Sequence, residues 1–273
     1  MSTRSDSQEE ISGQVDRPPR FSIALVNYKS LEMTSICLDL LQKAVDVSEI
    51  PVWVVDNDSN DASLDYLRSI DWIKLIERKP PGEEVGFLAH GRALDMILEK
   101  VSTEYLLLLH TDTFIYDPTI IDIMLEKFSA DDRVAAVGCM EPVLRKLPHT
   151  VWRTATRGTK YYFRRLKIAL GLKTRPPTLY YEVYFKSFCA LWNVNIIKSH
   201  GMSFSMGEKI PGYEMQDALP RLGYRFVKIA PREMFRYLDH IDKGTASAKD
   251  GIRLKRGKIR KYQDVVRKNL ANR

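Results

Sequence analysis

The sequence of 273 residues has few cysteines, no long apolar run and none of the common glycine-rich phosphate loops. Its three cysteines are odd in number and widely spaced, which argues against a disulfide framework and against a cysteine zinc site. Its apolar runs, such as the four leucines at 106–109, are far shorter than the roughly 20 residues that a membrane-spanning helix needs. Because neither the Walker phosphate loop nor the GxGxxG fingerprint occurs, the sequence does not fit P-loop NTPases or dinucleotide-binding dehydrogenases.

The composition is that of an ordinary globular protein, with 44% hydrophobic and 28% charged residues. Fourteen glycines and thirteen prolines are too few for a fibrous or disordered chain. The opening residues, MSTRSDSQEE, lack an apolar segment behind a basic start. We therefore expect no secretion signal and a cytoplasmic location.

The charge is distributed unevenly along the chain. Residues 142–181 contain ten Arg or Lys and no Asp or Glu, and residues 243–273 carry a net charge of +9. Since the total is only +7, the remaining residues together carry −12. An anionic partner is expected for the two basic segments: phospholipid, a lipid-linked pyrophosphate or nucleic acid.

Short apolar runs alternate with segments of helical periodicity over the first 110 residues. The pattern predicts strands at 21–26, 51–55, 72–76 and 105–109, and helices around 36–41, from about 64, and from about 86 to 101. This alternation is typical of βαβ units, so we expect an α/β fold with a mostly parallel central sheet flanked by helices. Residues 1–20 are polar and without periodicity, which predicts a flexible leader.

Polar side chains follow three of the predicted strands. Asn27 ends the first, Asp56, Asn57 and Asp58 end the second, and Asp112 follows the fourth. In parallel sheets the carboxyl ends of the strands meet at one edge, where ligands bind. A ligand site is therefore expected there, although Asn and Asp also serve simply as turn residues.

Five segments in a fixed order resemble the inverting glycosyltransferases of family 2, which have the GT-A fold. They are Val26–Tyr28, Val54–Ser63, Gly86–Leu94, Tyr105–Thr113 and Gly212–Arg225. The resemblance implies a glycosyltransferase domain at 21–242, with a Rossmann-like nucleotide-binding half at 21–115. An acceptor half would follow at 116–242, containing a basic insert at 142–181, and residues 243–273 would form a basic helical tail.

The resemblance also implies which residues bind the nucleotide-sugar donor. They are Val26, Asn27, Asp56, Asn57, Asp58, Gly86, Arg92, His110, Thr111 and Asp112. By analogy with the family, Asn27, Asp56 and Asn57 would surround the base and ribose. Gly86 and Arg92 would lie near the diphosphate, because glycine permits close approach and arginine presents a planar fork to phosphate oxygens.

The metal motif departs from the family pattern. Asp112 matches the second carboxylate of the DxD motif, but His110 stands where the first is expected. His240 matches a histidine that many members use as a metal ligand after the last core strand. We expect Asp112 and His240 to hold Mn²⁺ or Mg²⁺, with imidazole favouring Mn²⁺, and His110 to contact the ribose or cap the strand end. The alternative for His240 is a surface-loop histidine.

The resemblance makes Asp217 the catalytic base that removes the acceptor proton, with Glu214 as a substitute. Arg221 and Gly223 are closer together than in the family, so Pro220 is expected to shorten or break this helix. The alternative is that both carboxylates lie on a solvated helix face.

Residues 160–173 mix aromatic, aliphatic and cationic side chains. Ile168, Leu172 and Tyr161 or Phe163 can share one side, which suits a helix at a membrane interface. We therefore expect 157–175 and 252–270 to contact an anionic membrane surface; the alternative is an ordinary solvated basic helix.

Together with the family resemblance, these features predict a metal-dependent transferase that moves a hexosyl or deoxyhexosyl group from a nucleoside diphosphate sugar; inversion is implied by the resemblance alone. The acceptor would be a hydroxyl of a glycan or lipid-linked glycan, in bacterial-type surface glycan or glycolipid assembly at the inner face of the membrane. One alternative is a GT-A-like nucleotide-binding protein with altered catalysis. A nucleic-acid-binding protein is the other, but no zinc-finger spacing or RRM signature occurs, so no nucleic acid is expected.

Overall fold

The computed structural model describes residues 19–84 and 86–241. The tail at 243–273, with its expected membrane segment at 252–270, lies outside the described residues, as does the leader apart from its last two residues. The expected halves at 21–115 and 116–242 stay predictions.

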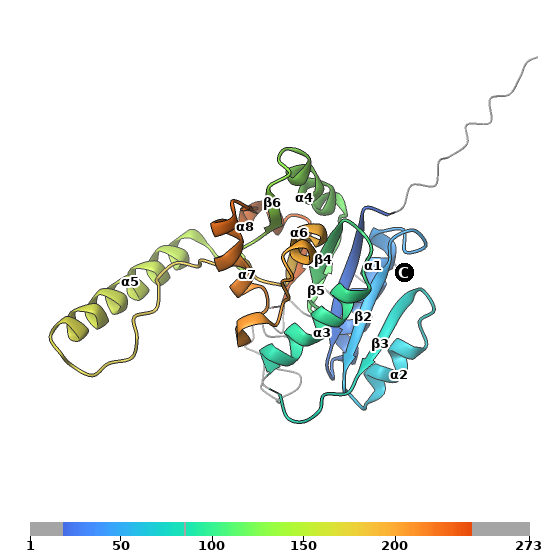
Figure 1. The fold of residues 1–273 in the computed structure, drawn as a ribbon, viewed down its shortest axis with the longest axis horizontal. Coiled ribbons are helices and arrows are strands. Elements are labelled where there is room, and N and C mark those ends of the chain that lie inside the picture. Colours follow the sequence, from blue (N-terminus) through green and yellow to red (C-terminus); the bar gives the residue numbers. More distant parts are fainter. Residues whose placement is uncertain (1–18, 85, 242–273) are drawn as a thin grey trace, which may run out of the picture.

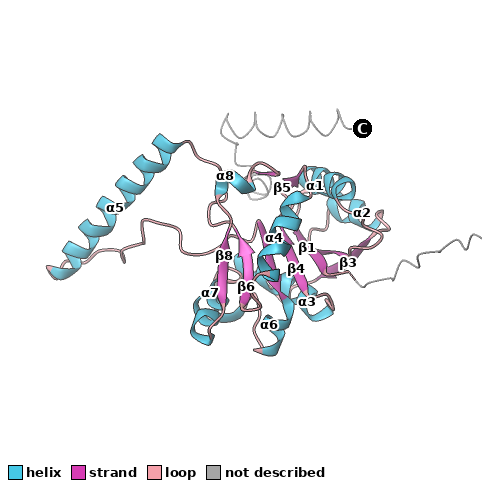
Figure 2. Ribbon diagram, turned by 90° about the horizontal axis from the view of Figure 1, so that it is seen from above, coloured by secondary structure: helices cyan, strands magenta, loops and turns pink. Residues whose placement is uncertain are grey.

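A seven-stranded sheet forms the centre of the molecule, in the order β3-β2-β1-β4-β7-β6-β8 (Figures 1 and 2). Its strands are β1 (Phe21–Asn27), β2 (Val52–Asn57), β3 (Ile73–Arg78), β4 (Tyr105–Leu109), β6 (Val134–Gly138), β7 (Cys189–Asn193) and β8 (Arg225–Lys228). Only β7 runs antiparallel to its neighbours, β4 and β6. The predicted α/β class with a mostly parallel sheet is therefore confirmed.

Helices cover both faces of this sheet (Figure 2). On one face lie α1 (Leu31–Ala44) and α4 (Thr119–Ser129), and on the other lie α3 (Gly86–Lys100), α6 (Val194–Ser199) and α7 (Tyr213–Ala218). Successive strand residues point to opposite faces, so Ile23 and Leu25 join the first core while Ala24 joins the second. Burial on both faces explains why these strands are continuous apolar runs. The shorter elements are α2 (Ala62–Arg68), η1 (Met206–Glu208), η2 (Leu219–Leu222) and α8 (Pro231–Met234).

A second, two-stranded sheet pairs β5 (Thr113–Ile115) with β9 (Leu238–His240) in antiparallel register. Thr113 lies opposite His240 in this pair. The pairing therefore carries His240 to a position beside Asp112, although the two residues are far apart in the sequence.

One helix stands apart from the body. Helix α5 (Leu147–Ala169) projects outward, and the chain returns along it before entering β7 (Figure 1). None of its residues is buried. Within the described part of the chain, no helix combines the length and apolarity needed to cross a bilayer.

Candidate metal and nucleotide site

The carboxyl ends of β1, β2 and β4 meet at one edge of the sheet, as the sequence predicts, and a cavity of about 1180 Å³ opens above them. That volume accommodates a ligand larger than a typical drug-sized molecule. Eight predicted site residues line it: Val26, Asn57, Asp58, Gly86, His110, Thr111, Asp112 and His240. Asn27, Asp56, Arg92, Glu214 and Asp217 are not among its lining residues.

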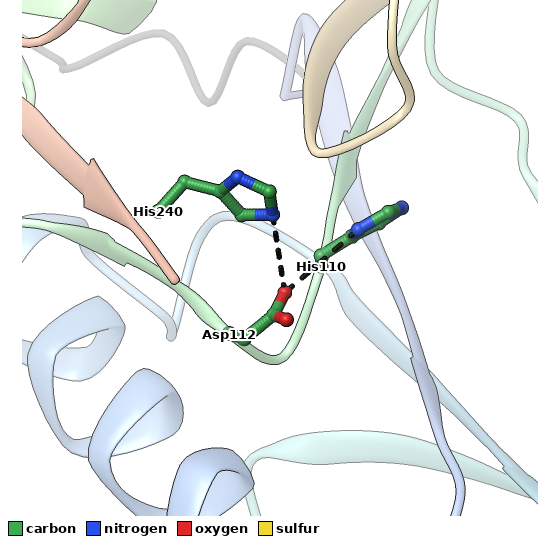
Figure 3. A group of neighbouring side chains, drawn as sticks. All are labelled: His110, Asp112 and His240. Atoms are coloured by element: carbon green, nitrogen blue, oxygen red, sulfur yellow. Dashed lines mark ion pairs between the residues drawn. The ribbon is translucent and has the colours of Figure 1, made fainter. Parts of the chain in front are cut away.

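His110, Asp112 and His240 converge at this cavity (Figure 3). Oδ1 of Asp112 lies 3.3 Å from Nε2 of His240 and 3.8 Å from Nδ1 of His110, and one ligand atom from each residue falls within 4.8 Å of the others. A cation bound at about 2.1 Å needs donor atoms roughly 3–4 Å apart. The separations of Asp112 from His240 and from His110 fall in this range, so the three side chains could hold a single ion.

The ring orientation of His240 supports a cation at this point. Its Nδ1 lies 2.7 Å from the carbonyl oxygen of Pro142, and since a carbonyl only accepts, Nδ1 must carry a proton. In the neutral ring, Nε2 then directs its lone pair at the Asp112 carboxylate. A cation lying between these two acceptors, which are 3.3 Å apart, would attract both. A backbone partner on the far nitrogen is typical of histidines that ligate metals.

His110 is held in a similar way. The hydroxyl of Ser187 lies 2.8 Å from its Nε2, which leaves Nδ1 on the side of Asp112. The expectation that His110 contacts the ribose or caps the strand end stays a prediction, and its ring also lies within the group that could hold an ion.

A third histidine, His90 on α3, was missed by the sequence reasoning. Its ring contacts that of His110 edge-on at 5.2 Å, and its buried Nε2 has no hydrogen-bond partner among the described residues. Burial, with a smaller effect of His110, lowers the pKa of His90 to about 3, so this ring is neutral. Its position one turn after Gly86 on the cavity-facing helix was the available signal.

Asn27 and Asp56 lie beneath the cavity in a buried polar network. Asn27 Nδ2 donates to Asp56 Oδ1 at 2.7 Å, and the backbone N–H of Ser59 donates to Asp56 Oδ2 at 2.9 Å. The hydroxyl of Thr34 donates to Asn27 Oδ1 at 2.8 Å. These bonds hold the loop that carries Asp58, whose φ is +62°, an orientation that Asp adopts more readily than most residues. The side chains exposed to a ligand are therefore Asn57 and Asp58.

Arg92 is bound by a carboxylate. It pairs with Glu84, which Arg78 also contacts at 2.6 Å. Burial alone would raise the pKa of Glu84, but the two arginines hold it below its usual range, so the carboxylate stays charged. Asn57 in turn accepts a hydrogen bond from Arg78 at 2.6 Å.

Lys186 is the only lysine or arginine among the described residues that line the cavity. Its Nζ lies 2.5 Å from the Tyr213 hydroxyl and 3.3 Å from Glu182. Burial alone would lower the pKa of Lys186, but Tyr213 and Glu182 raise it, so the ammonium group stays charged. Lys186 follows a segment, 142–181, that contains ten other Lys or Arg residues, so the sequence offered no reason to single out this lysine.

Asp217 and Glu214 lie on α7, behind the cavity wall. The hydroxyl of Tyr184 donates to Asp217 Oδ1 at 2.8 Å, and Lys209 pairs with both carboxylates, at 2.5 Å from Glu214 and 3.5 Å from Asp217. The ring of Tyr184 stacks at 4.2 Å on Tyr213, which lines the cavity. The predicted shortening near Pro220 is confirmed, since α7 ends at Ala218 and the 3₁₀ turn η2 follows.

Comparisons with known proteins bear on this arrangement. The model of the family described as glycosyl transferase family 2 matches residues 22–190. A search of curated proteins found no match. Among solved structures, the mannosyltransferase PcManGT from Pyrobaculum calidifontis, in complex with GDP-Man and Mn²⁺, is similar with 16% identity and a TM-score of 0.54, over 79% of this chain and 56% of that chain. TarS 1-349 from S. aureus is similar with 16% identity and a TM-score of 0.49, over 86% of this chain and 64% of that chain. This chain thus spans little more than half to about two thirds of these proteins, and the first likeness shows the fold alone.

Proposed function

Because the chain belongs to glycosyl transferase family 2 and has the GT-A fold, we propose that it transfers a sugar from a nucleoside diphosphate sugar to an acceptor hydroxyl with the help of a divalent cation. The observation that carries this proposal is the group His110, Asp112 and His240 at the carboxyl edge of the sheet. The His240 ring places Nε2 toward the Asp112 carboxylate and Nδ1 on the carbonyl oxygen of Pro142, and this orientation suits a cation bound between His240 and Asp112.

The charge of the cavity supports a requirement for that cation. Among the residues that the structure describes, four carboxylates line the cavity, those of Asp58, Glu83, Glu84 and Asp112, against the one ammonium group of Lys186. Of these four carboxylates, Glu84 is neutralised by two arginines, Arg78 and Arg92. A diphosphate entering such a cavity meets net repulsion unless further positive charge is present. A bound divalent cation supplies that charge and stabilises the departing diphosphate as a Lewis acid.

The donor set favours Mn²⁺ over Mg²⁺. Two imidazole nitrogens and one carboxylate form the group, and Mg²⁺ prefers oxygen ligands whereas Mn²⁺ accepts nitrogen more readily. Asn57 and Asp58 then take the base and ribose, and Lys186 takes the diphosphate role that the family resemblance gives to Arg92. Arg92 is directed at Glu84 instead.

For the acceptor step, we propose Asp217 as the carboxylate that receives the acceptor proton. Tyr184 links it to the cavity wall, since this phenol donates to Asp217 and its ring stacks on Tyr213. Asp217→Asn is expected to lower sugar transfer by about 10²-fold or more while nucleotide binding is retained. Glu214→Gln is the matched control on the same helix. Equal losses in both variants would mean that α7 is merely structural here.

The sugar, the acceptor and the stereochemistry rest on the motif resemblance. We propose transfer of a hexosyl or deoxyhexosyl group with inversion, to a glycan or lipid-linked acceptor, in surface glycan or glycolipid assembly. The basic composition of residues 142–181 supports an acceptor or surface that carries negative charge.

A nucleotide panel tests the proposal directly. Thermal unfolding with UDP, GDP, dTDP or CMP, each with Mn²⁺ or with EDTA, should identify one diphosphate that stabilises the protein only when Mn²⁺ is present. At 100 times its Kd a ligand stabilises the folded state by about 2.7 kcal/mol. If no nucleotide stabilises the protein with any divalent cation, the proposal is wrong.

The presence of His110 where the family has the first aspartate of its DxD motif also favours a second function, nucleotide binding without transfer. This alternative predicts Mn²⁺-dependent binding of the nucleotide but no release of that nucleotide from any sugar donor. Timed measurement of free nucleotide from a panel of sugar nucleotides separates the two functions.

A further inference from the structure

Residues 142–187, which we call the arm, leave the body between β6 and β7 and return to it (Figure 1). Both ends of the arm line the cavity, through Pro142 at the start and Lys186 and Ser187 at the end. Pro142 accepts the hydrogen bond of His240, and Ser187 contacts His110. The arm is therefore joined directly to the candidate metal site.

One face of α5 is covered by the returning part of the arm. Arg153 and Arg157 pair with Glu182 at 2.7 and 3.0 Å, and the ring of Tyr161 contacts Tyr180 at 5.8 Å. Tyr161, which the sequence offered as an alternative to Phe163 on the apolar side, therefore faces the returning chain.

The opposite face of α5 is apolar and uncovered among the described residues. Leu147, Val151 and Leu166 recur at helical spacing, and Trp152 beside them is 71% exposed. Tyr162, at the edge of this face, contacts the ring of Tyr180 on the returning chain at 6.2 Å. Further exposed apolar side chains at the far end of the arm are Phe163, Ile168, Leu170 and Leu172. A contiguous apolar surface of this kind marks an interaction site.

The charge of the arm decides between possible occupants. Residues 142–181 hold ten cations and no carboxylate, so pairing this face with the same face of a second copy brings two strongly positive segments together. Nucleic acid would complement the charge but not the row of aliphatic side chains. An anionic bilayer provides both hydrocarbon for the apolar face and negative headgroups for the flanking Lys160 and Arg165.

We propose that the uncovered face of α5 docks onto an anionic lipid bilayer, with Trp152 and Leu166 entering the headgroup–acyl boundary. Docking would hold the cavity at the membrane surface, because the arm begins and ends at the cavity wall. This consequence rests on the proposed function: an acceptor carried on a lipid would then meet the donor site without leaving the bilayer. The docking itself needs no nucleotide.

Trp152 provides a local probe in the full-length protein, since the other three tryptophans, Trp53, Trp72 and Trp192, lie in the body and are at least partly buried. Vesicles of phosphatidylcholine with 30% phosphatidylglycerol, prepared with and without brominated acyl chains, are added at low salt. We expect a blue shift and bromine quenching in the wild type, both lost in Trp152→Phe while vesicle sedimentation is retained. Quenching that is equal in the two proteins overturns the proposal.

A second pair of variants tests the apolar face as a whole. Trp152→Ser combined with Leu166→Ser should weaken partitioning onto these vesicles about tenfold, because two apolar side chains no longer enter the interface. Leu222→Ser, at an exposed leucine on η2 away from the arm, should leave it unchanged.

Two further outcomes would overturn the docking surface. One is unchanged partitioning of the double variant, which would assign vesicle binding to charge outside this face. The other is a concentration-dependent dimer of the wild type, without vesicles, that the double variant abolishes, which would make a second copy the occupant. Vesicle docking without any nucleotide binding would instead leave the surface intact and refute only the transferase.

Discussion

The strand ends beneath the cavity and the arm that begins and ends beside it are held in place by different forces. Beneath the cavity, β1, β2 and β4 are buried on both faces, and the polar network of Asn27 and Asp56 is closed within the protein. Helix α5 has no buried residue and is tied to its returning segment by ion pairs and aromatic contacts. The first region owes its geometry to core packing, whereas the arm keeps its apolar side chains available to a partner. Yet the ends of the arm orient both candidate metal histidines, so the two regions meet at the site.

The largest effect is expected at the point where the regions meet. Asp112→Ala removes the carboxylate between the two histidines and should lower sugar transfer by about 10³-fold. Mn²⁺-dependent stabilisation by the nucleotide should disappear with it, as measured by thermal unfolding. Asp122→Ala, at an exposed carboxylate on α4, is the matched control. If Asp112→Ala keeps its Mn²⁺-dependent nucleotide binding, Asp112 is not a ligand of the metal.

The same substitution in the two regions should separate packing from exposure. Leu107→Ala empties part of the core beneath the cavity and should cost about 3 kcal/mol of unfolding free energy. Leu166→Ala on the arm should cost less than about 0.5 kcal/mol, because its side chain is exposed. Urea unfolding followed by circular dichroism measures both values. Similar losses would show that the face of α5 packs against something within this chain.

Lys186 tests whether the arm contributes to the donor site. Lys186→Met keeps the length of the side chain but removes its charge, and we expect nucleoside diphosphate affinity to fall about tenfold by calorimetry. Arg92→Met should have a smaller effect, since its guanidinium is bound to Glu84. A larger loss of affinity in Arg92→Met than in Lys186→Met would instead assign the diphosphate to Arg92.

The smallest effect concerns the acid sensitivity of the arm. Burial would raise the pKa of Glu182, but Arg153, Arg157 and Lys186 lower it to about 2. A carboxyl whose folded pKa lies below its unfolded value of about 4.5 contributes stability above pH 4.5, and that contribution is lost as the pH falls toward 2. We expect this loss to be about 1 kcal/mol, because the cluster is partly solvated. It should appear as a smaller protection of the arm amides against hydrogen exchange, after correction for the intrinsic exchange rate at each pH.

Glu182→Gln should make the protection of the arm amides, measured relative to their intrinsic exchange rates, nearly independent of pH in this range, whereas Glu126→Gln, at an exposed glutamate of α4, should not. An unchanged acid response in Glu182→Gln would show that the arm is not held by this cluster.

Local sequence patterns predicted the first four strands of the sheet and the edge of the sheet where the cavity lies. The four predicted strands are present to within two residues, and Asp58, His110 and Asp112 line the cavity because parallel strands end at the same side of the sheet. The pairing of His240 with Asp112 was expected only from the family resemblance. Spacing in the sequence carries no information on the β5–β9 contact that brings the two together.

Side-chain partners were predicted less well. The expected role of Arg92 at the diphosphate stays a prediction; its ion pair with Glu84 depends on the path of a loop, which the sequence does not show. His90 and Lys186 were missed because neither follows a predicted strand, and only the assembled cavity shows that both face it. The roles proposed for Asn57, Asp58, Lys186 and Asp217 stay predictions.

By itself, the sequence determined the α/β class, the ligand edge of the sheet and the position of the basic segment, because these follow from periodicity, strand direction and composition. The tertiary structure decided which nitrogen of His240 faces Asp112 and that the side chain of Lys186 lines the cavity. It also decided which face of α5 is left uncovered among the described residues. Those outcomes depend on contacts between distant parts of the chain, and no local pattern of residues encodes such contacts.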